Sequence, residues 1–174
     1  MTGYAELHCI SNFTFLRGAS HPAELVERAA LLGYAALALT DECSVAGMVR
    51  AHVAARRHAL KLIVGSEFTL ADGLRLVVLA ADREGYAALC GLITRGRRVA
   101  EKGSYHLVRG DFEQLPAGCR VLWLPPEVPE PGDASWLRAH FTGRAWLAVE
   151  LHADGDEPRR CARLLAFADA QRIP

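Results

Sequence analysis

The feature that most constrains the fold is an alternation of short apolar runs with amphipathic stretches along the chain. Apolar runs predict strands at 4–10, 35–40, 61–64, 120–124 and 145–151. Helical spacing of apolar residues predicts helices at 22–32, 44–60, 83–97 and 157–171. This order implies a parallel sheet with right-handed crossovers, and hence an α/β layered or barrel fold.

The segments between these elements differ in character. Residues 69–79 predict a hairpin that turns at 71–73, because the Asp-Gly pair there is a strong turn signal. We expect residues 102–118 to be irregular and the proline-rich segment 125–132 to be a connection. The chain stops directly after a predicted helix, where a further strand would begin. We therefore expect it to be cut before its last strand or strands.

The composition is that of one folded domain with no membrane segment. The 174 residues include 20 basic and 20 acidic side chains, and 51% are hydrophobic, whereas disordered chains combine low hydrophobicity with high net charge. No apolar run approaches the roughly 20 residues that a spanning helix needs, so we predict a cytoplasmic location. A net charge of zero argues against strong non-specific binding to nucleic acid. Motifs for dinucleotides, for nucleoside triphosphates and for serine hydrolases are absent from the sequence.

Candidate functional residues follow three predicted strands. His8 lies near the end of the first strand, Asp41 and Glu42 just past the second, and Glu67 just past the third. In parallel α/β folds such positions gather at one end of the sheet, where functional sites lie. Imidazole and carboxylates are common ligands of divalent metals, so His8, Glu42 and Glu67 are candidate metal ligands. Helix capping and ordinary hydrogen bonding explain the same residue types equally well.

Four segments of the chain, in order, carry a resemblance to a known family. They are Tyr-Ala-Glu-Leu-His-Cys-Ile-Ser-Asn-Phe with Leu-Arg-Gly-Ala-Ser (4–20), Ala-Leu-Thr-Asp-Glu (38–42), Ile-Val-Gly-Ser-Glu-Phe (63–68) and Leu-Val-Val-Leu-Ala (76–80). Together they resemble the polymerase and histidinol phosphatase (PHP) domain at the N-terminus of bacterial C-family DNA polymerases. The Glu-Leu-His-Cys opening and the Thr-Asp-Glu-Cys-Ser run are similar to the error-prone, lesion-bypass branch of that family.

The resemblance implies a truncated, distorted seven-stranded (β/α) PHP barrel, similar to a TIM barrel. In active members a metal cluster at the carboxyl ends of the strands supports phosphoester hydrolysis or 3′–5′ proofreading. An intact site would hold zinc or manganese. The polymerase that carries such a domain would use magnesium for nucleotidyl transfer.

This sequence departs from the family's metal-binding pattern at several positions. The second His of the first motif is Ile10, and the Asp expected before Gly-Ala is Arg17. The His expected after Thr-Asp is Glu42, and the His expected before Leu-Val-Val-Leu-Ala is Arg75. The Gly-Cys motif expected after the strand near residue 124 is absent, and Pro125-Pro126 stands there. Only two of the expected ligands, His8 and Glu67, are retained.

These departures predict a degenerate site without catalytic residues or a bound cofactor. Any residual metal site would use His8, Glu42 and Glu67. Alternatively, Arg17 and Arg75 replace the metal charge with fixed guanidinium charge. They would then form a salt-bridged cluster with Asp41, Glu42 and Glu67 that holds the mouth of the barrel closed.

The leading hypothesis is that residues 1–174 are the N-terminal PHP domain of an error-prone DNA polymerase, which acts in DNA replication and in repair of DNA damage. The domain would be a scaffold, inactive alone, with nucleotidyl transfer in the polymerase body of the same chain. Its partners would be that body, DNA through the parent protein, and other replication or mutagenesis proteins, but no membrane. The alternatives are a metal-dependent phosphoesterase or 3′–5′ exonuclease of the PHP superfamily, and a DNA-contacting module using the basic residues Arg95, Arg97, Arg98 and Lys102. A solvated basic helix end also explains those four residues.

Overall fold

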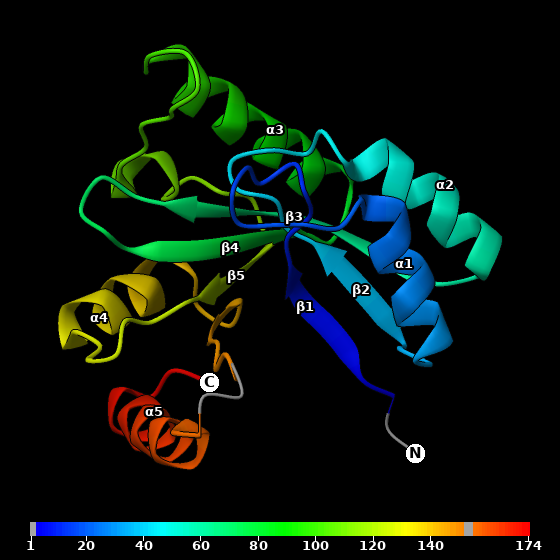
Figure 1. The fold of residues 1–174 in the computed structure, drawn as a ribbon. Coiled ribbons are helices and arrows are strands. Elements are labelled where there is room, and N and C mark those ends of the chain that lie inside the picture. The colour runs from blue at the N-terminus through cyan, green and yellow to red at the C-terminus, as the bar shows by residue number, and fades with distance from the viewer. Residues whose placement is uncertain (1–2, 152–154) are drawn as a thin grey trace.

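The computed structural model describes residues 3–151 and 155–174. Within these ranges the chain alternates strands and helices, as Figure 1 shows. The strands are β1 (Ala5–Cys9), β2 (Ala36–Leu39), β3 (Lys61–Thr69), β4 (Arg75–Ala80), β5 (Cys119–Trp123) and β6 (Ala145–Leu147). The helices are α1 (Pro22–Leu31), α2 (Met48–His58), α3 (Arg83–Arg98), α4 (Pro131–His140) and α5 (Glu157–Gln171), with a 3-10 turn at Arg109–Asp111. None of these helices is both long and apolar enough to cross a membrane.

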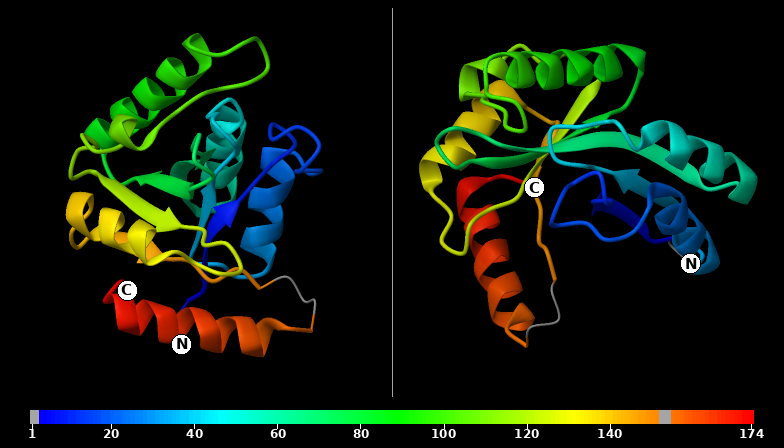
Figure 2. Two further views of the ribbon diagram at one scale, coloured as in Figure 1. Left: turned by 90° about the vertical axis from the view of Figure 1, so that its left-hand side faces the viewer. Right: turned by 45° about the horizontal axis from the view of Figure 1, so that its top comes forward.

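The strands form one curled sheet in sequence order, β1 to β6 (Figure 2). Parallel pairing joins β1 to β2, β2 to β3, and β5 to β6. Antiparallel pairing joins β4 to both β3 and β5, so the sheet is mixed, and the expected parallel arrangement is confirmed only for the other three pairs. The reason is the hairpin between β3 and β4, which turns β4 back against its neighbour. The described residues form a curled sheet of six strands, and the seven-stranded barrel stays a prediction.

Two predicted boundaries are wrong for local reasons. Strand β3 continues past Gly65 to Thr69, because this glycine lets neighbouring strands pack closely. A Cβ atom at position 65 would lie 2.6 Å from a methyl carbon of Leu79. The proline-rich connection ends in an unpredicted helix, α4, whose first residue is Pro131. Proline suits the first turn of a helix, where its missing N–H would have no partner.

The two faces of the sheet have separate apolar cores. On one face, α1 and α2 pack over Leu37 and Leu39, and the other helices pack over residues that include Leu76 and Trp123. The inner face of the curl carries the alternate residues Ala38, Val77, Leu79, Leu122 and Leu124. A groove of about 820 Å³ opens on this inner face between β1 and β6. The carboxyl ends of β1, β2 and β3 meet beside the groove and position the candidate site.

Candidate functional site

Glu67 is the centre of the candidate site. It lies inside β3, near the carboxyl end of the strand, and not just past it as predicted. Side chains alternate along a strand, so Glu67 shares the inner face of the sheet with its β4 partner Val77. No part of the Glu67 side chain is exposed. A carboxylate in such a place is stable only if it is paired and hydrogen-bonded.

Three cationic side chains surround the Glu67 carboxylate. The Arg17 guanidinium donates from Nη1 to Oε1 and from Nη2 to Oε2, both at 3.0 Å. Arg75, at the first position of β4, donates from Nη2 to Oε1 at 3.0 Å. His8, in β1 as predicted, places its Nε2 atom 2.9 Å from Oε2. Both oxygens of Glu67 are therefore shared between cations.

Two further carboxylates extend this arrangement. Arg17 also donates to Glu42 Oε2 at 2.8 Å, and the Nδ1 atom of His8 lies 2.8 Å from Glu150 Oε1. Three cations thus alternate with three carboxylates in a continuous chain of contacts. We call this the ion-pair cluster, and it consists of His8, Arg17, Glu42, Glu67, Arg75 and Glu150.

The contacts within the cluster fix the charge of its members. Burial alone would lower the pKa of His8, but hydrogen bonds with Glu150 and Glu67 outweigh it and raise this pKa to about 9. Burial alone would raise the pKa of Glu67, but hydrogen bonds from His8 and Arg17 lower it to about 2. At neutral pH, His8 is therefore a cation that donates from both ring nitrogens, and Glu67 is an anion.

A rigid loop brings Arg17 to the cluster. Asp41 is buried at the end of β2, and its carboxylate accepts hydrogen bonds from the Ser11 N–H, the Ser11 hydroxyl and the Thr14 hydroxyl, at 2.7–2.8 Å. These bonds hold the β1–α1 loop (residues 10–21) in place. A Cβ atom at Gly18 would lie 1.9 Å from the Ser11 carbonyl oxygen, so the loop closes tightly on itself. Asp41 was expected to join the arginines, but it anchors the loop that presents Arg17.

Glu42 is held beside Glu67 by backbone pairing. The chain after β2 continues alongside β3 and forms a parallel bridge between Glu42 and Glu67. The Tyr105 hydroxyl donates to Glu42 Oε1 at 2.8 Å and accepts from the Thr69 N–H at the same distance. The structure therefore brings together the three predicted metal-ligand candidates, but the Arg17 guanidinium lies between Glu42 and Glu67.

Two residues of the site were not predicted from the sequence. Glu150 lies at the end of the predicted strand 145–151, so the rule that picked the other strand-end residues would have found it. Tyr105 lies in a segment without regular structure, and no sequence signal marks it. Only the folded chain brings it against Glu42.

The residues present do not fit a metal cluster. A histidine ligand offers a nitrogen lone pair, but both nitrogens of His8 face carboxylates and carry protons at neutral pH. Arg17 and Arg75 cannot ligate a cation, and their charge repels one. Among the described residues, no group of three or more His, Cys, Asp or Glu side chains is arranged to hold a metal ion. The ion pairs occupy the oxygens that a metal would need.

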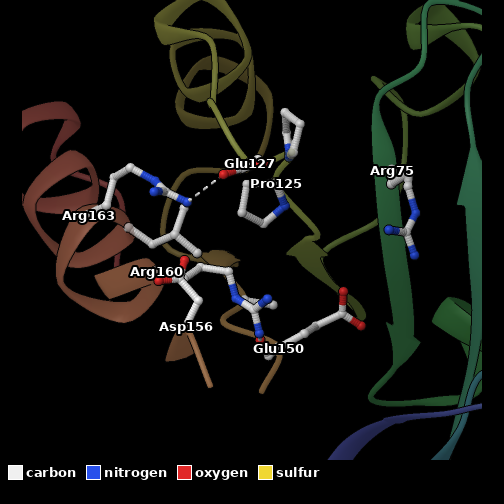
Figure 3. Close-up of a pocket in the computed structure, with 10 residues that line it drawn as sticks. Arg75, Pro125, Glu127, Glu150, Asp156, Arg160 and Arg163 are labelled. Carbon is white, nitrogen blue, oxygen red and sulfur yellow. Dashed lines mark hydrogen bonds and ion pairs between the residues drawn. The ribbon is translucent and has the colours of Figure 1, made fainter. Parts of the chain in front are cut away.

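A charged cavity of about 460 Å³ lies next to the cluster (Figure 3). Arg75 and Glu150 belong to both the cluster and the cavity wall. Figure 3 shows Arg163 pointing toward Glu127, with which it forms an ion pair at 3.7 Å. Basic and acidic groups alternate around this cavity, whose lining residues are Arg75, Pro125, Pro126, Glu127, Ala148, Glu150, Asp156, Arg160, Arg163 and Leu164.

The predicted basic helix end is partly engaged in internal contacts. Arg95 pairs with Asp111 at 3.1 Å. Arg97 donates to the Cys43 carbonyl oxygen at 3.2 Å and lies over the Tyr105 ring. Arg97 therefore helps to hold the region around Glu42 together, whereas Arg95 ties α3 to the 3-10 turn.

Comparison with known proteins gives consistent matches over the whole chain. Residues 6–170 match the family model of the PHP domain. The error-prone DNA polymerase of Dechloromonas aromatica (strain RCB) is 56% identical over 176 residues, which cover 98% of this chain and 17% of that polymerase. The error-prone DNA polymerase of Pseudomonas aeruginosa (strain PAO1) is 56% identical over 174 residues, which cover 100% of this chain and 17% of that polymerase. The chain therefore spans about a sixth of the length of these relatives.

A solved structure shows the same fold. A protein described as a metal-dependent phosphoesterase, from Bifidobacterium adolescentis ATCC 15703, superposes with a TM-score of 0.70. The match covers 99% of this chain and 85% of that protein, at 18% sequence identity. At this identity the likeness concerns the path of the backbone alone.

Proposed function

Because the chain belongs to the PHP domain family, we propose that it is the PHP domain of an error-prone DNA polymerase, with a structural role in place of hydrolysis. In this proposal the ion-pair cluster replaces the family's metal cluster. The observation that carries it is the set of contacts on Glu67, whose two oxygens accept from two arginines and a protonated histidine.

The charge balance of the cluster supports this role. Glu67 is a retained family ligand, and a buried carboxylate without a partner would be costly. In metal-binding relatives the metal would neutralise it, whereas here Arg17 and Arg75 do so with charges that are present at every physiological pH. The same contacts tie β1, β3 and β4 to the β1–α1 loop. The cluster thereby joins separate elements at the mouth of the barrel.

His8 and Glu67, the two family ligands that this sequence retains, offer no group for acid–base chemistry. A general base needs a free lone pair near neutral pH, and His8 keeps its proton up to about pH 9. Glu67 has no exposed surface and a pKa of about 2, so it cannot take a proton from water or from a substrate. Neither the phosphoesterase nor the exonuclease alternative has a candidate base among these residues.

The parent protein would carry the polymerase activity. We propose that residues 1–174 stand at the start of a longer cytoplasmic polymerase, whose body performs magnesium-dependent nucleotidyl transfer and contacts DNA. A seventh barrel strand would then follow the described chain. The Leu147 N–H already donates to the Pro174 carbonyl oxygen at 2.7 Å, so the chain after α5 runs beside β6.

Metal content and hydrolysis test the proposal together. The full-length protein is incubated with zinc or manganese and desalted, and its metal is counted in the wild type and in His8→Ala. Hydrolysis of a generic phosphoester and of a 3′ DNA end is measured on the same samples, with polymerase activity as the check on intact protein. We expect no difference in metal content between the two proteins and no hydrolysis that depends on His8. A metal ion and a hydrolytic rate that are both lost in His8→Ala would overturn the structural role.

A further inference from the structure

The β1–α1 loop presents large apolar side chains to solvent. Phe15 is 84% exposed, Leu16 is 89% exposed, and Phe13 beside them is partly exposed. Leu16 also has a φ of +64°, a left-handed conformation that non-glycine residues seldom adopt. Backbone strain of this kind gathers at binding and catalytic sites, where the surrounding structure maintains it. The loop is therefore a candidate contact surface.

The loop is held rigidly, so its apolar tip does not turn inward. The Asn12 N–H donates to the Ser20 carbonyl oxygen at 2.9 Å, which closes the base of the loop. The Gly18 N–H donates to the Thr14 carbonyl oxygen at 3.0 Å, and Thr14 is itself bonded to the buried Asp41. A rigid apolar contact loses little entropy on binding, which favours association.

A small cavity with aromatic walls lies beside this tip. It measures about 320 Å³, and Phe13, Phe15, Tyr105 and Arg97 contribute to its lining. The Arg97 guanidinium carbon lies 5.4 Å from the centre of the Tyr105 ring, and the side chain is fixed further by backbone carbonyls. Aromatic faces next to a fixed guanidinium provide the surroundings in which a planar ring stacks.

Helix α2, which also contacts the loop, carries positive charge. Exposed basic residues with fixed charge run along it and just beyond it, at Arg50, Arg56, Arg57 and Lys61, and residues 48–61 contain no acid. In the described part of the chain, none of these four lies within ion-pair distance of a carboxylate. The neighbouring α1 carries Glu24 and Glu27 beside a single base, Arg28, so the excess of positive charge lies on α2.

The two features are physically joined. The Arg50 guanidinium carbon lies 5.7 Å from the centre of the Phe13 ring. Figure 1 shows that the loop after β1 lies beside the start of α2, in agreement with this contact. The whole chain has a net charge of zero, which makes this local excess of positive charge a property of one face.

We infer that the tip of the β1–α1 loop (Phe13, Phe15 and Leu16) and the basic face of α2 form a binding surface for single-stranded nucleic acid. The rings of the tip stack on bases, and the cations of α2 follow the phosphates. Single-stranded DNA or RNA combines a regular negative charge with exposed planar bases, and so matches both halves of the surface. A duplex hides its base faces within the stack and would use only the cations. The inference rests on this surface alone and not on the ion-pair cluster.

Site-specific photo-crosslinking in the full-length protein tests the inference. Phe15 is replaced by the photoreactive benzoylphenylalanine, and a labelled oligothymidylate is the probe. We expect a covalent protein–DNA adduct that an unlabelled single strand competes away more effectively than a duplex. The double variant Arg50→Glu, Arg57→Glu should reduce the yield of adduct several-fold. The same photoreactive residue at Val128, an exposed position in the connection before α4, is the matched control and should give no adduct above background.

The other outcomes overturn the inference. An equal adduct at Phe15 and Val128 would show only chance encounters with DNA. A crosslink from position 15 to another peptide of the same protein would show that the loop docks on protein. Absence of any adduct with labelled oligothymidylate or oligouridylate, in a sample that still extends a primer, would exclude single-stranded nucleic acid from this surface. Loss of polymerase activity is scored separately, so failure of the proposed function is distinguishable from failure of this inference.

Discussion

Glu67 is a buried carboxylate that accepts hydrogen bonds from three cationic side chains. Breaking a buried ion pair by removing one partner is costly, because the remaining charges lose their compensation. The loss is larger for a residue at the centre of a cluster than for one at its edge. Substitution of a member of the ion-pair cluster should therefore lower the free energy of unfolding more, the more deeply that member is buried.

Replacing the central carboxylate should destabilise the domain strongly. We expect Glu67→Gln to lower the free energy of unfolding by about 3–5 kcal/mol, since the neutral amide leaves Arg17, Arg75 and His8 without their shared anion. Arg75→Ala should cost about 1 kcal/mol, because the Arg75 side chain is 37% exposed and partly screened by water. Urea denaturation measures both, with the exposed Glu101→Gln as the control. An unchanged midpoint in Arg75→Ala and Glu67→Gln would contradict a stabilising cluster.

The charge of His8 makes stability depend on pH. Its pKa is raised from 6.5 to about 9 on folding, so its contribution is fully present below pH 6.5 and is lost as the pH rises through 9. Glu67 has the opposite dependence. Its pKa is lowered from 4.5 to about 2, so its contribution is present above pH 4.5 and is lost as the pH falls through 2.

We expect the wild-type free energy of unfolding to fall between pH 6.5 and about pH 8.5, by up to roughly 1.4 kcal/mol per pH unit. His8→Gln should lack this fall, because it removes the titrating group. The comparison uses urea denaturation at half-unit steps of pH. Nuclear magnetic resonance adds a direct check, since the His8 ring signals should not titrate between pH 5 and about pH 7.5. Parallel pH profiles for the two proteins would show that His8 is not a cation in the folded state.

At the level of elements, sequence patterns predict some features well and others poorly. The Asp72-Gly73 turn correctly marks the hairpin between β3 and β4, since left-handed backbone at Gly73 leaves few alternatives. The prediction for 61–64 ends β3 too early, because Gly65 is a typical strand terminator but here permits close packing against Leu79. The connection predicted at 125–132 overlaps the start of α4, because proline is typical of connections but also begins helices, as Pro131 does here.

The candidate site shows the same limit. His8, Glu42 and Glu67 could be picked from strand ends, because strand order alone brings those ends together. The contacts of Asp41 could not be predicted, since a buried carboxylate can either pair with a cation or accept hydrogen bonds from a loop. Tyr105 depends on where an irregular segment returns to the sheet, and local sequence does not determine that path.

Two glycines of α3 should respond oppositely to the same substitution. A Cβ atom at Gly91 would meet nothing within 4 Å, so Gly91→Ala should stabilise the protein by about 0.5–1 kcal/mol through lower backbone entropy. A Cβ atom at Gly96 would lie 2.9 Å from Leu107, and overpacking costs about 1–3 kcal/mol. Gly96→Ala should therefore be destabilising. Thermal unfolding of the two variants checks the pair, and equal shifts would contradict the packing of α3 against residue 107.

At the level of the whole molecule, the cluster joins parts of the chain that are far apart in sequence. His8 and Glu150 lie 142 residues apart, and their contact connects the first strand to the segment after the last described strand. Strands β1 and β6 are the two edges of the sheet, and the groove lies between them. The ion pairs therefore stabilise the curl at a place where no strand pairing does so within the described residues. A metal cluster would serve the same purpose in a relative that has one.

If arginine charge has taken the place of a metal, restoring the family's residues should restore a response to metal. The double variant Arg17→Asp, Arg75→His removes both fixed cations from around Glu67 and adds two possible ligands. The carboxylates of Glu42, Glu67 and Glu150 would then repel one another, and a divalent cation would relieve that repulsion. We expect manganese or zinc to raise the melting temperature of this variant. A metal concentration about 100 times the dissociation constant raises the free energy of unfolding by roughly 2.7 kcal/mol.

The wild type should show no such response, and a chelator should return the variant to its starting temperature. Adding Glu67→Gln to the double variant removes the central ligand and should abolish the effect, which separates this site from chance binding elsewhere. Circular dichroism verifies that each protein is folded before metal is added. If the double variant is folded and neither metal raises its melting temperature, then Arg17 and Arg75 do not replace a metal cation. An equal rise in the melting temperature of the wild type would mean that a metal ion binds even with the ion pairs in place.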